Sequence, residues 1–240
     1  MSGRSSGVAL LLVIWLLAVL SLTLGSLVAV VRQELQLSHW QREHTHAVWA
    51  AQAGVALAVR ALLDPRPERR WIADGRLQLL SFEGVALQVR VHSERGKLDL
   101  NLAASDDLAR LALRLGASAI QAQALAASLA TRRLEAAPPL RLPEEIRAWP
   151  GMSEPLYLHL APHLTVWSGL AHPEPAFASP ELRQALGLAA VNPQAADPGP
   201  ILSIETIALS PGGISAVVDT TVLLSIEQGT RPYRVLRYSE

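Results

Sequence analysis

The 240-residue chain has the composition of a globular protein, with 50% hydrophobic and 18% charged residues. Its 21 Lys and Arg balance 21 Asp and Glu, so no net charge would steer it onto nucleic acid or an anionic surface. The chain has no cysteine, which excludes a disulfide framework, a thiolate zinc site and a cysteine nucleophile.

The N-terminal quarter is predicted to be one long helix that begins in a membrane. Residues 8–31 carry no charge and would span roughly 36 Å as a helix, enough for a hydrocarbon core of about 30 Å. The stub before them carries Arg4, so the positive-inside rule places residues 1–7 in the cytoplasm and the remainder outside. A cleaved secretory signal is the alternative, although its apolar region is normally shorter and ends at a cleavage site.

The helix is expected to continue to about residue 63, because the first proline is Pro65. Apolar residues recur at helical spacing over 48–62, and no charge occurs between Glu43 and Arg60. One stripe should pack on a folded domain and leave the other side free for a partner. We choose Val48 and Ala51 as test positions for that free side.

Beyond Pro65 the apolar period changes to two, which indicates strands. Residues 77–79 and 85–91 alternate around Glu83 and Gly84 and predict a hairpin, and 97–102 predict a third strand. Three more strands are predicted at 201–209, 214–227 and 233–238, after a proline-rich linker at 192–200.

The middle of the chain is predicted to be helical. Ser105 and Ser118 are placed as N-caps of two helices that end near Gly116 and residue 134, and shorter helices are predicted at 142–149, 154–160 and 182–186. The fold class is therefore α+β, with a long N-terminal membrane-spanning helix packed on an antiparallel sheet and an all-α insertion. The predicted segments are a leader at 1–7, a transmembrane part at 8–31, the outer helix and first strands at 32–102, a helical insertion at 103–190, and the linker and C-terminal strands at 191–240.

Three histidines on the long helix invite a metal interpretation, which helix geometry rejects. His39 and His46 share a face about 10 Å apart along the axis, and His44 lies on the side opposite His46. Asp99, Asp106 and Asp107 could supply oxygens to calcium, but no loop has a calcium-motif spacing. No catalytic or metal residue is assigned.

Motifs for hydrolases, nucleoside triphosphatases and dinucleotide binding are absent from the sequence, and residues 210–213 (SPGG) predict a turn between two strands. The chain is therefore expected not to be an enzyme. A bitopic membrane enzyme remains the alternative class, because an active site can be assembled from residues distant in sequence.

Residues 142–164 resemble a helix-hairpin-helix unit whose turn is Pro150 and Gly151. Nucleic-acid-binding examples usually have a second glycine near Ser153 and basic residues after it, whereas Glu144 and Glu154 flank this turn. We interpret the unit as a packing or partner-binding hairpin, and no nucleic acid is expected as a partner.

Several segments together resemble the K-type minor pseudopilins of bacterial type II secretion systems. Gly7 followed by Val8 and further apolar residues resembles the leader junction at which prepilin peptidase cleaves and methylates the new terminus. Most pilins carry glutamate as the fifth mature residue, but this chain has Leu12, as K-type proteins do. The other matching segments are 53–55 (AGV), 96–101 (GKLDLN), 150–152 (PGM), 160–166 (LAPHLTV) and 232–237 (PYRVLR).

The resemblance implies a subunit at the tip of the pseudopilus, which initiates its assembly for export of folded proteins across the outer membrane. It implies I-type and J-type minor pseudopilins as partners, with an H-type subunit as a further candidate, and prepilin peptidase as the processing enzyme. It also implies a single-pass protein of the bacterial inner membrane with a periplasmic globular part. Some relatives bind calcium, but no residue here is assigned to it. A minor pilin of a type IV pilus or DNA-uptake system is the alternative.

Overall fold

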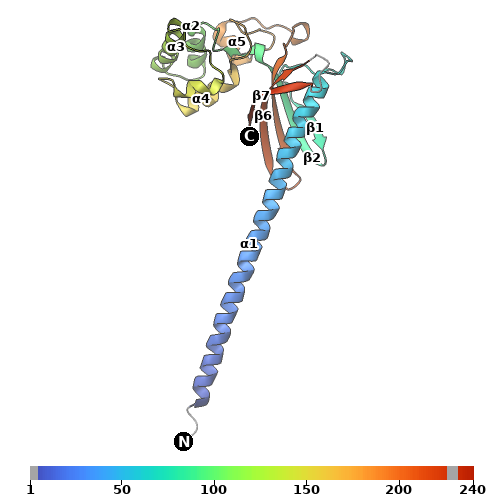
Figure 1. Ribbon diagram of the computed structural model, residues 1–240, viewed down its shortest axis with the longest axis vertical. Helices are drawn as coiled ribbons and strands as arrows, with labels where there is room; N and C mark the ends of the chain where they lie inside the picture. Colours follow the sequence, from blue (N-terminus) through green and yellow to red (C-terminus); the bar gives the residue numbers. More distant parts are fainter. Residues whose placement is uncertain (1–4, 226–231) are drawn as a thin grey trace.

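The computed structural model describes residues 5–225 and 232–240, except for the side chains of residues 5–11, 24–32 and 35. Helix α1 (Ser5–Leu62) extends far beyond the globular part and packs on it along its last turns (Figure 1). Within the described residues, no helix is long and apolar enough to cross a membrane. The predicted span at 8–31 therefore gains no support, and the side chains at 8–11 and 24–31 lie outside the described residues.

Five antiparallel strands form the main sheet in the order β1-β2-β5-β6-β7. The predicted hairpins are confirmed: β1 pairs with β2 around Glu83 and Gly84, and β5 pairs with β6 around the turn at 210–213. β2 also pairs with β5, although more than a hundred residues separate them in sequence, so the helical block is inserted between neighbouring strands. The bounds are β1 Gln78–Phe82, β2 Val85–Ser93, β5 Ile201–Leu209, β6 Ser215–Leu224 and β7 Tyr233–Ser239.

The first core lies between α1 and one face of this sheet. Strand β2 shows why: Val85, Leu87, Val89 and Val91 are buried, because the period of two places them all on the face toward α1. The facing side of α1 is rich in alanine and contains Gly54. A Cβ on Gly54 would lie 2.6 Å from Thr206 Cγ2, so this glycine lets the helix approach β5 closely.

The prediction that Val48 and Ala51 lie on the free, partner-binding side of the long helix is wrong. Ala51 is 0% exposed and Val48 packs against the same core, so both lie toward the sheet. Small side chains permit the closest approach of helix to sheet, and the alanines therefore mark the packed face. The free face is a different stripe, which begins near Thr45 and passes through Trp49 and Gln52.

A second core lies inside the helical block, which Figure 1 shows beside the sheet. Ser118 caps its helix in a capping box with Gln121, as the sequence predicts for the cap, and Ser179 caps the last helix. The predicted cap at Ser105 is wrong, because Ala104 is the N-cap and makes no side-chain hydrogen bond. The elements are α2 Ser105–Arg114, α3 Ala119–Leu134, η2 Pro143–Ala148, α4 Glu154–Leu160, η3 Ala161–His163 and α5 Pro180–Leu186; short turns η1 Glu94–Gly96 and η4 Pro193–Ala195 flank the block.

The third predicted strand is much shorter than expected and does not join the main sheet. β3 (Leu98–Asp99) pairs in parallel with β4 (Leu164–Thr165) and forms a separate two-stranded sheet. Leu98 and Leu100 are buried in the second core, which draws this segment away from β2 and into the helical block.

Candidate binding surfaces on the sheet and the long helix

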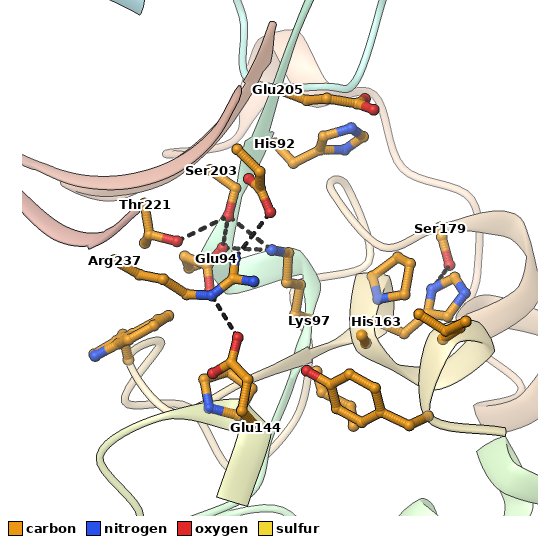
Figure 2. Close-up of a pocket in the computed structure, with 18 of the residues that line it drawn as sticks. His92, Glu94, Lys97, Glu144, His163, Ser179, Ser203, Glu205, Thr221 and Arg237 are labelled. Carbon is orange, nitrogen blue, oxygen red and sulfur yellow. Dashed lines mark hydrogen bonds and ion pairs between the residues drawn. The ribbon is translucent and has the colours of Figure 1, made fainter. Parts of the chain in front are cut away.

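The segment that joins the two cores is built around a buried carboxylate. Glu94 is 1% exposed and is paired with Lys97, whose Nζ lies 2.6 Å from Glu94 Oε1. The Ser203 hydroxyl also donates to this carboxylate, and Lys97 Nζ donates to Ser203 Oγ at 2.8 Å (Figure 2). The Thr165 hydroxyl donates to the other oxygen, Glu94 Oε2. Glu94 therefore connects η1, strand β4 of the helical block and strand β5 of the main sheet. Its buried charge is satisfied on both oxygens.

A second ionic contact connects the helical block with the C-terminal strand. Arg237 Nε donates to Glu144 Oε1 at 2.6 Å, and its Nη1 donates to Asp219 Oδ2 at 2.8 Å. Burial by itself would lower the pKa of Arg237, but the contacts with Asp219 and Glu144 outweigh it and raise the pKa. The other Glu144 oxygen, Oε2, is buried and has no hydrogen-bond partner among the described residues; in proteins such a group costs about 1–3 kcal/mol.

These two contacts lie on the walls of a cleft of 380 Å³ between the sheet and the helical block. Strand alternation puts His92, Ser203, Glu205 and Asp219 on this side of the sheet, opposite the face that α1 covers. The helical block supplies mainly apolar and aromatic side chains. Among these lining residues from the block are Pro143, Tyr157, Leu158, Pro162 and Trp167.

A serine and a histidine meet at the edge of the cleft, and their geometry is structural. His163 Nδ1 lies 2.9 Å from Ser179 Oγ, which resembles a nucleophile–base pair. Ser179 Oγ, however, is the N-cap of α5 and accepts from the Leu182 amide at 3.1 Å. Within the part of the chain that is described, no carboxylate is hydrogen-bonded to His163 to complete a triad. Burial lowers the pKa of His163, as it does that of His92, and this favours the neutral form of both rings.

The exposed stripe of α1 is the second candidate surface. Trp49 is 67% exposed in the middle of a stretch without charged side chains, and such an aromatic is a frequent anchor of protein interfaces. Beside it, His46 lies 4.0 Å from Glu83 of the β1–β2 turn, and Gln52 Nε2 donates to the Tyr238 hydroxyl at 2.9 Å. The exposed stripe is thus contacted from both edges of the sheet, by the β1–β2 turn and by edge strand β7. The sequence analysis did not single out Trp49. The alanines on the other face could have indicated it, because a helix side of small residues packs closely on a sheet and leaves the opposite side exposed.

The structure keeps the sequence-based metal candidates apart. His44 stacks on Trp40 with 5.1 Å between ring centroids, and His46 faces Glu83. Asp99 accepts from the Asn101 and Gly169 amides and the Ser168 hydroxyl, so its oxygens hold a loop. Across residues 5–225 and 232–240, no group of three His, Asp or Glu side chains is placed to hold a metal ion.

The helix-hairpin-helix turn packs against its own domain. Gly151 has φ of +83°, and a Cβ there would lie 3.0 Å from both Ala124 Cβ and the Gln121 carbonyl oxygen. The turn is thus seated on α3. This agrees with the packing interpretation. Only the helical backbone is described at Gly7 and Val8, the predicted processing site, so the structure does not test that prediction.

A long N-terminal helix packed lengthwise on an antiparallel sheet, with a helical block inserted between two strands, defines a pseudopilin-like fold. Consistent with this class, the structure is similar to GspK in "The Crystal Structure of the GspK-GspI-GspJ complex from enterotoxigenic Escherichia coli Type 2 Secretion System". The match has a TM-score of 0.58 and 16% sequence identity, and covers 84% of this chain and 98% of that one. The chain therefore has a GspK-like pseudopilin fold, which confirms the predicted resemblance at the level of the fold. No protein-family model and no curated protein matches the sequence.

Proposed function

We propose that this chain is a K-type minor pseudopilin of a type II secretion system, a non-catalytic subunit at the tip of the pseudopilus that initiates assembly. The observation that supports the proposal is the GspK-like fold, which the structural match covers over 84% of this chain. Leu12 in place of the usual glutamate fits a tip position, since a subunit with no neighbour above it has no partner amine for a carboxylate to neutralise.

The proposal includes anchoring in the bacterial inner membrane by residues 8–31, with the globular part in the periplasm. It also includes processing by prepilin peptidase between Gly7 and Val8. After co-expression of the full chain with a prepilin peptidase, N-terminal sequencing should give Val8 as the first residue, and mass spectrometry should show one added methyl group. A mature terminus within or after residues 25–31 would instead identify a secretory signal and contradict the proposal.

The proposed partners are I-type and J-type minor pseudopilins, and the proposed contact is the exposed stripe of α1. This stripe has two properties of a helix–helix interface: α1 itself has no charged residue between Glu43 and Arg60, and the small residue Ala56 follows two turns after Trp49 on the same side. A neighbouring long helix could lie along it without disturbing the packing of α1 on its own sheet.

Trp49→Ala should weaken binding of purified I-type and J-type soluble domains by about 30-fold, because a central interface tryptophan typically contributes 2 kcal/mol or more. Biolayer interferometry with the full chain in detergent measures its affinity for each of the two partner domains. Leu79→Ala is the matched control: Leu79 is 72% exposed and apolar, but lies on β1 away from α1. If the Trp49→Ala and Leu79→Ala variants bind the partner domains with equal affinity, the exposed stripe of α1 is not the contact surface. Preferential binding of type IV minor pilins would favour the alternative family.

A further inference from the structure

Strand β7 is an open edge of the main sheet. It is the last strand in the order β1-β2-β5-β6-β7, and across residues 5–225 and 232–240 it pairs with β6 alone. None of its seven residues is buried, and within those ranges its outer side makes no backbone–backbone hydrogen bond. Such an edge presents a row of unpaired amides and carbonyls, and an extended chain segment is the ligand that matches this row.

The side of this edge that lies toward α1 is apolar and aromatic. Tyr233, Val235 and Tyr238 pair with residues of β6 that point toward α1, so all three lie on that side of the sheet. Val235 and Tyr238 are exposed, whereas their partners on β6, Val222 and Thr220, are buried. The apolar surface at β7 therefore has no cover within the described part of the chain.

The apolar side of β7 continues into the exposed stripe of α1. Gln52 of the stripe donates from Nε2 to the Tyr238 hydroxyl at 2.9 Å. Nearer the C-terminal end of the helix, Ala56 and Leu63 line one groove together with Tyr233. The stripe and the edge of β7 thus form one continuous surface, and a partner seated on the stripe reaches the edge strand.

The opposite face of β7 indicates the charge of the segment that would pair with it. Arg237 is held by Glu144 and Asp219. Arg234, by contrast, is exposed and forms no ion pair among the described residues. Because opposite charges on adjacent strands stabilise a sheet, Arg234 favours an added strand that carries an acidic residue beside it.

We propose that the minor pseudopilin bound on the α1 stripe also adds an extended segment to β7, as a sixth strand of the sheet with an acidic residue beside Arg234. The inference rests on the proposed function, which supplies the partner, and it adds a second contact of different chemistry. A subunit of the same fold class can make both contacts at once, because its long helix lies beside the edge of its own sheet, as α1 lies beside β7 here. Main-chain hydrogen bonds then supply affinity, and the side chains of β7 select the sequence of the added strand.

The first test is hydrogen–deuterium exchange of the full chain in detergent, with and without a saturating I-type or J-type soluble domain. In an antiparallel edge strand every second amide faces outward, so the peptide covering 232–240 should take up about three fewer deuterons at short times when the partner is bound. The peptide covering β1, the other edge strand, should be unchanged. Unchanged uptake at 232–240 while the partner is bound would overturn the inference.

Val235→Lys should weaken binding of the partner domain by about tenfold, because a lysine on an edge strand opposes the addition of another strand. Leu79→Lys is the matched control: Leu79 is also an exposed apolar side chain on an edge strand, but on β1, and its replacement should leave the affinity unchanged. Equal affinities of the two lysine variants would reject pairing at β7.

The contact proposed on α1 is judged separately from the strand. If Trp49→Ala binds normally and uptake at 232–240 still falls, pairing at β7 stands and the helix contact does not. If Trp49→Ala weakens binding but uptake at 232–240 is the same with and without the partner, the helix contact stands and pairing at β7 is rejected. A full chain that binds neither domain would contradict both.

Discussion

Replacing Lys97 by methionine is expected to lower the free energy of unfolding by about 3–5 kcal/mol, because it leaves the buried Glu94 carboxylate without its cation. Methionine keeps the length and most of the volume of the lysine stem, so that the change removes charge rather than packing. Ser203 also loses the donor that Lys97 Nζ supplies at 2.8 Å. Urea unfolding of the full chain in detergent, followed by tryptophan fluorescence, measures the effect.

Removing the carboxylate as well should restore most of this stability. In the double variant Lys97→Met with Glu94→Gln no charge is buried, and stability should return to within about 1–2 kcal/mol of wild type. Arg147→Met is the control for loss of an ordinary surface ion pair, since it breaks the exposed contact with Glu154 and should cost no more than about 1 kcal/mol. If Lys97→Met costs as little as Arg147→Met, the Glu94 carboxylate is reached by water.

Local patterns in the sequence were sufficient for most secondary structure. The period of two around Glu83 and Gly84 predicted β1 and β2, and the turn at 210–213 predicted the β5–β6 hairpin. Ser118 stood at a helix N-terminus with the side-chain cap that its position suggested. These features depend on residues at most four apart, which is why one sequence reveals them.

Long-range pairing could not be read in the same way. The segment at 97–102 alternates like a strand, but its leucines belong to the second core and its backbone pairs with β4, more than sixty residues later. No local pattern indicates that partner. The interpretation of α1 failed for a related reason: an alanine-rich face can be either a close-packed core or a close partner contact, and only the sheet shows that Ala51 is in the core.

The cleft was also beyond the reach of the sequence. Glu94, Glu144, Ser203 and Arg237 come from four elements of two cores, with separations of up to 109 residues between hydrogen-bonded partners. Each of these residues alone reads as an ordinary surface polar residue. The resembling segments had already included Arg237 of this group and Lys97, the partner of Glu94, and the structure now gives a physical reason: both side chains help to hold the helical block to the sheet.

Gly96 lies next to Lys97, and its replacement is also expected to have a large effect. Gly96→Ala should lower the free energy of unfolding by about 3 kcal/mol or more. A Cβ at this position would lie 2.2 Å from the Phe177 carbonyl oxygen and 2.5 Å from its carbonyl carbon. These are backbone atoms, so no rotamer change can relieve the contact, and overpacking of this kind usually costs 1–3 kcal/mol even where side chains can move. Chemical denaturation by urea measures the change.

The loop that Gly96 meets cannot easily withdraw. The Phe177 amide donates to the Glu174 carbonyl at 3.1 Å, and the Glu174 amide donates to the Arg95 carbonyl at 2.7 Å, so the loop is tied to the residue next to the glycine. Gly212→Ala is the matched control, because its nearest neighbour is the flexible Glu43 carboxylate at 3.3 Å, and its cost should stay below about 1 kcal/mol. Equal stability of the two variants would mean that the contact between Gly96 and Phe177 is loose.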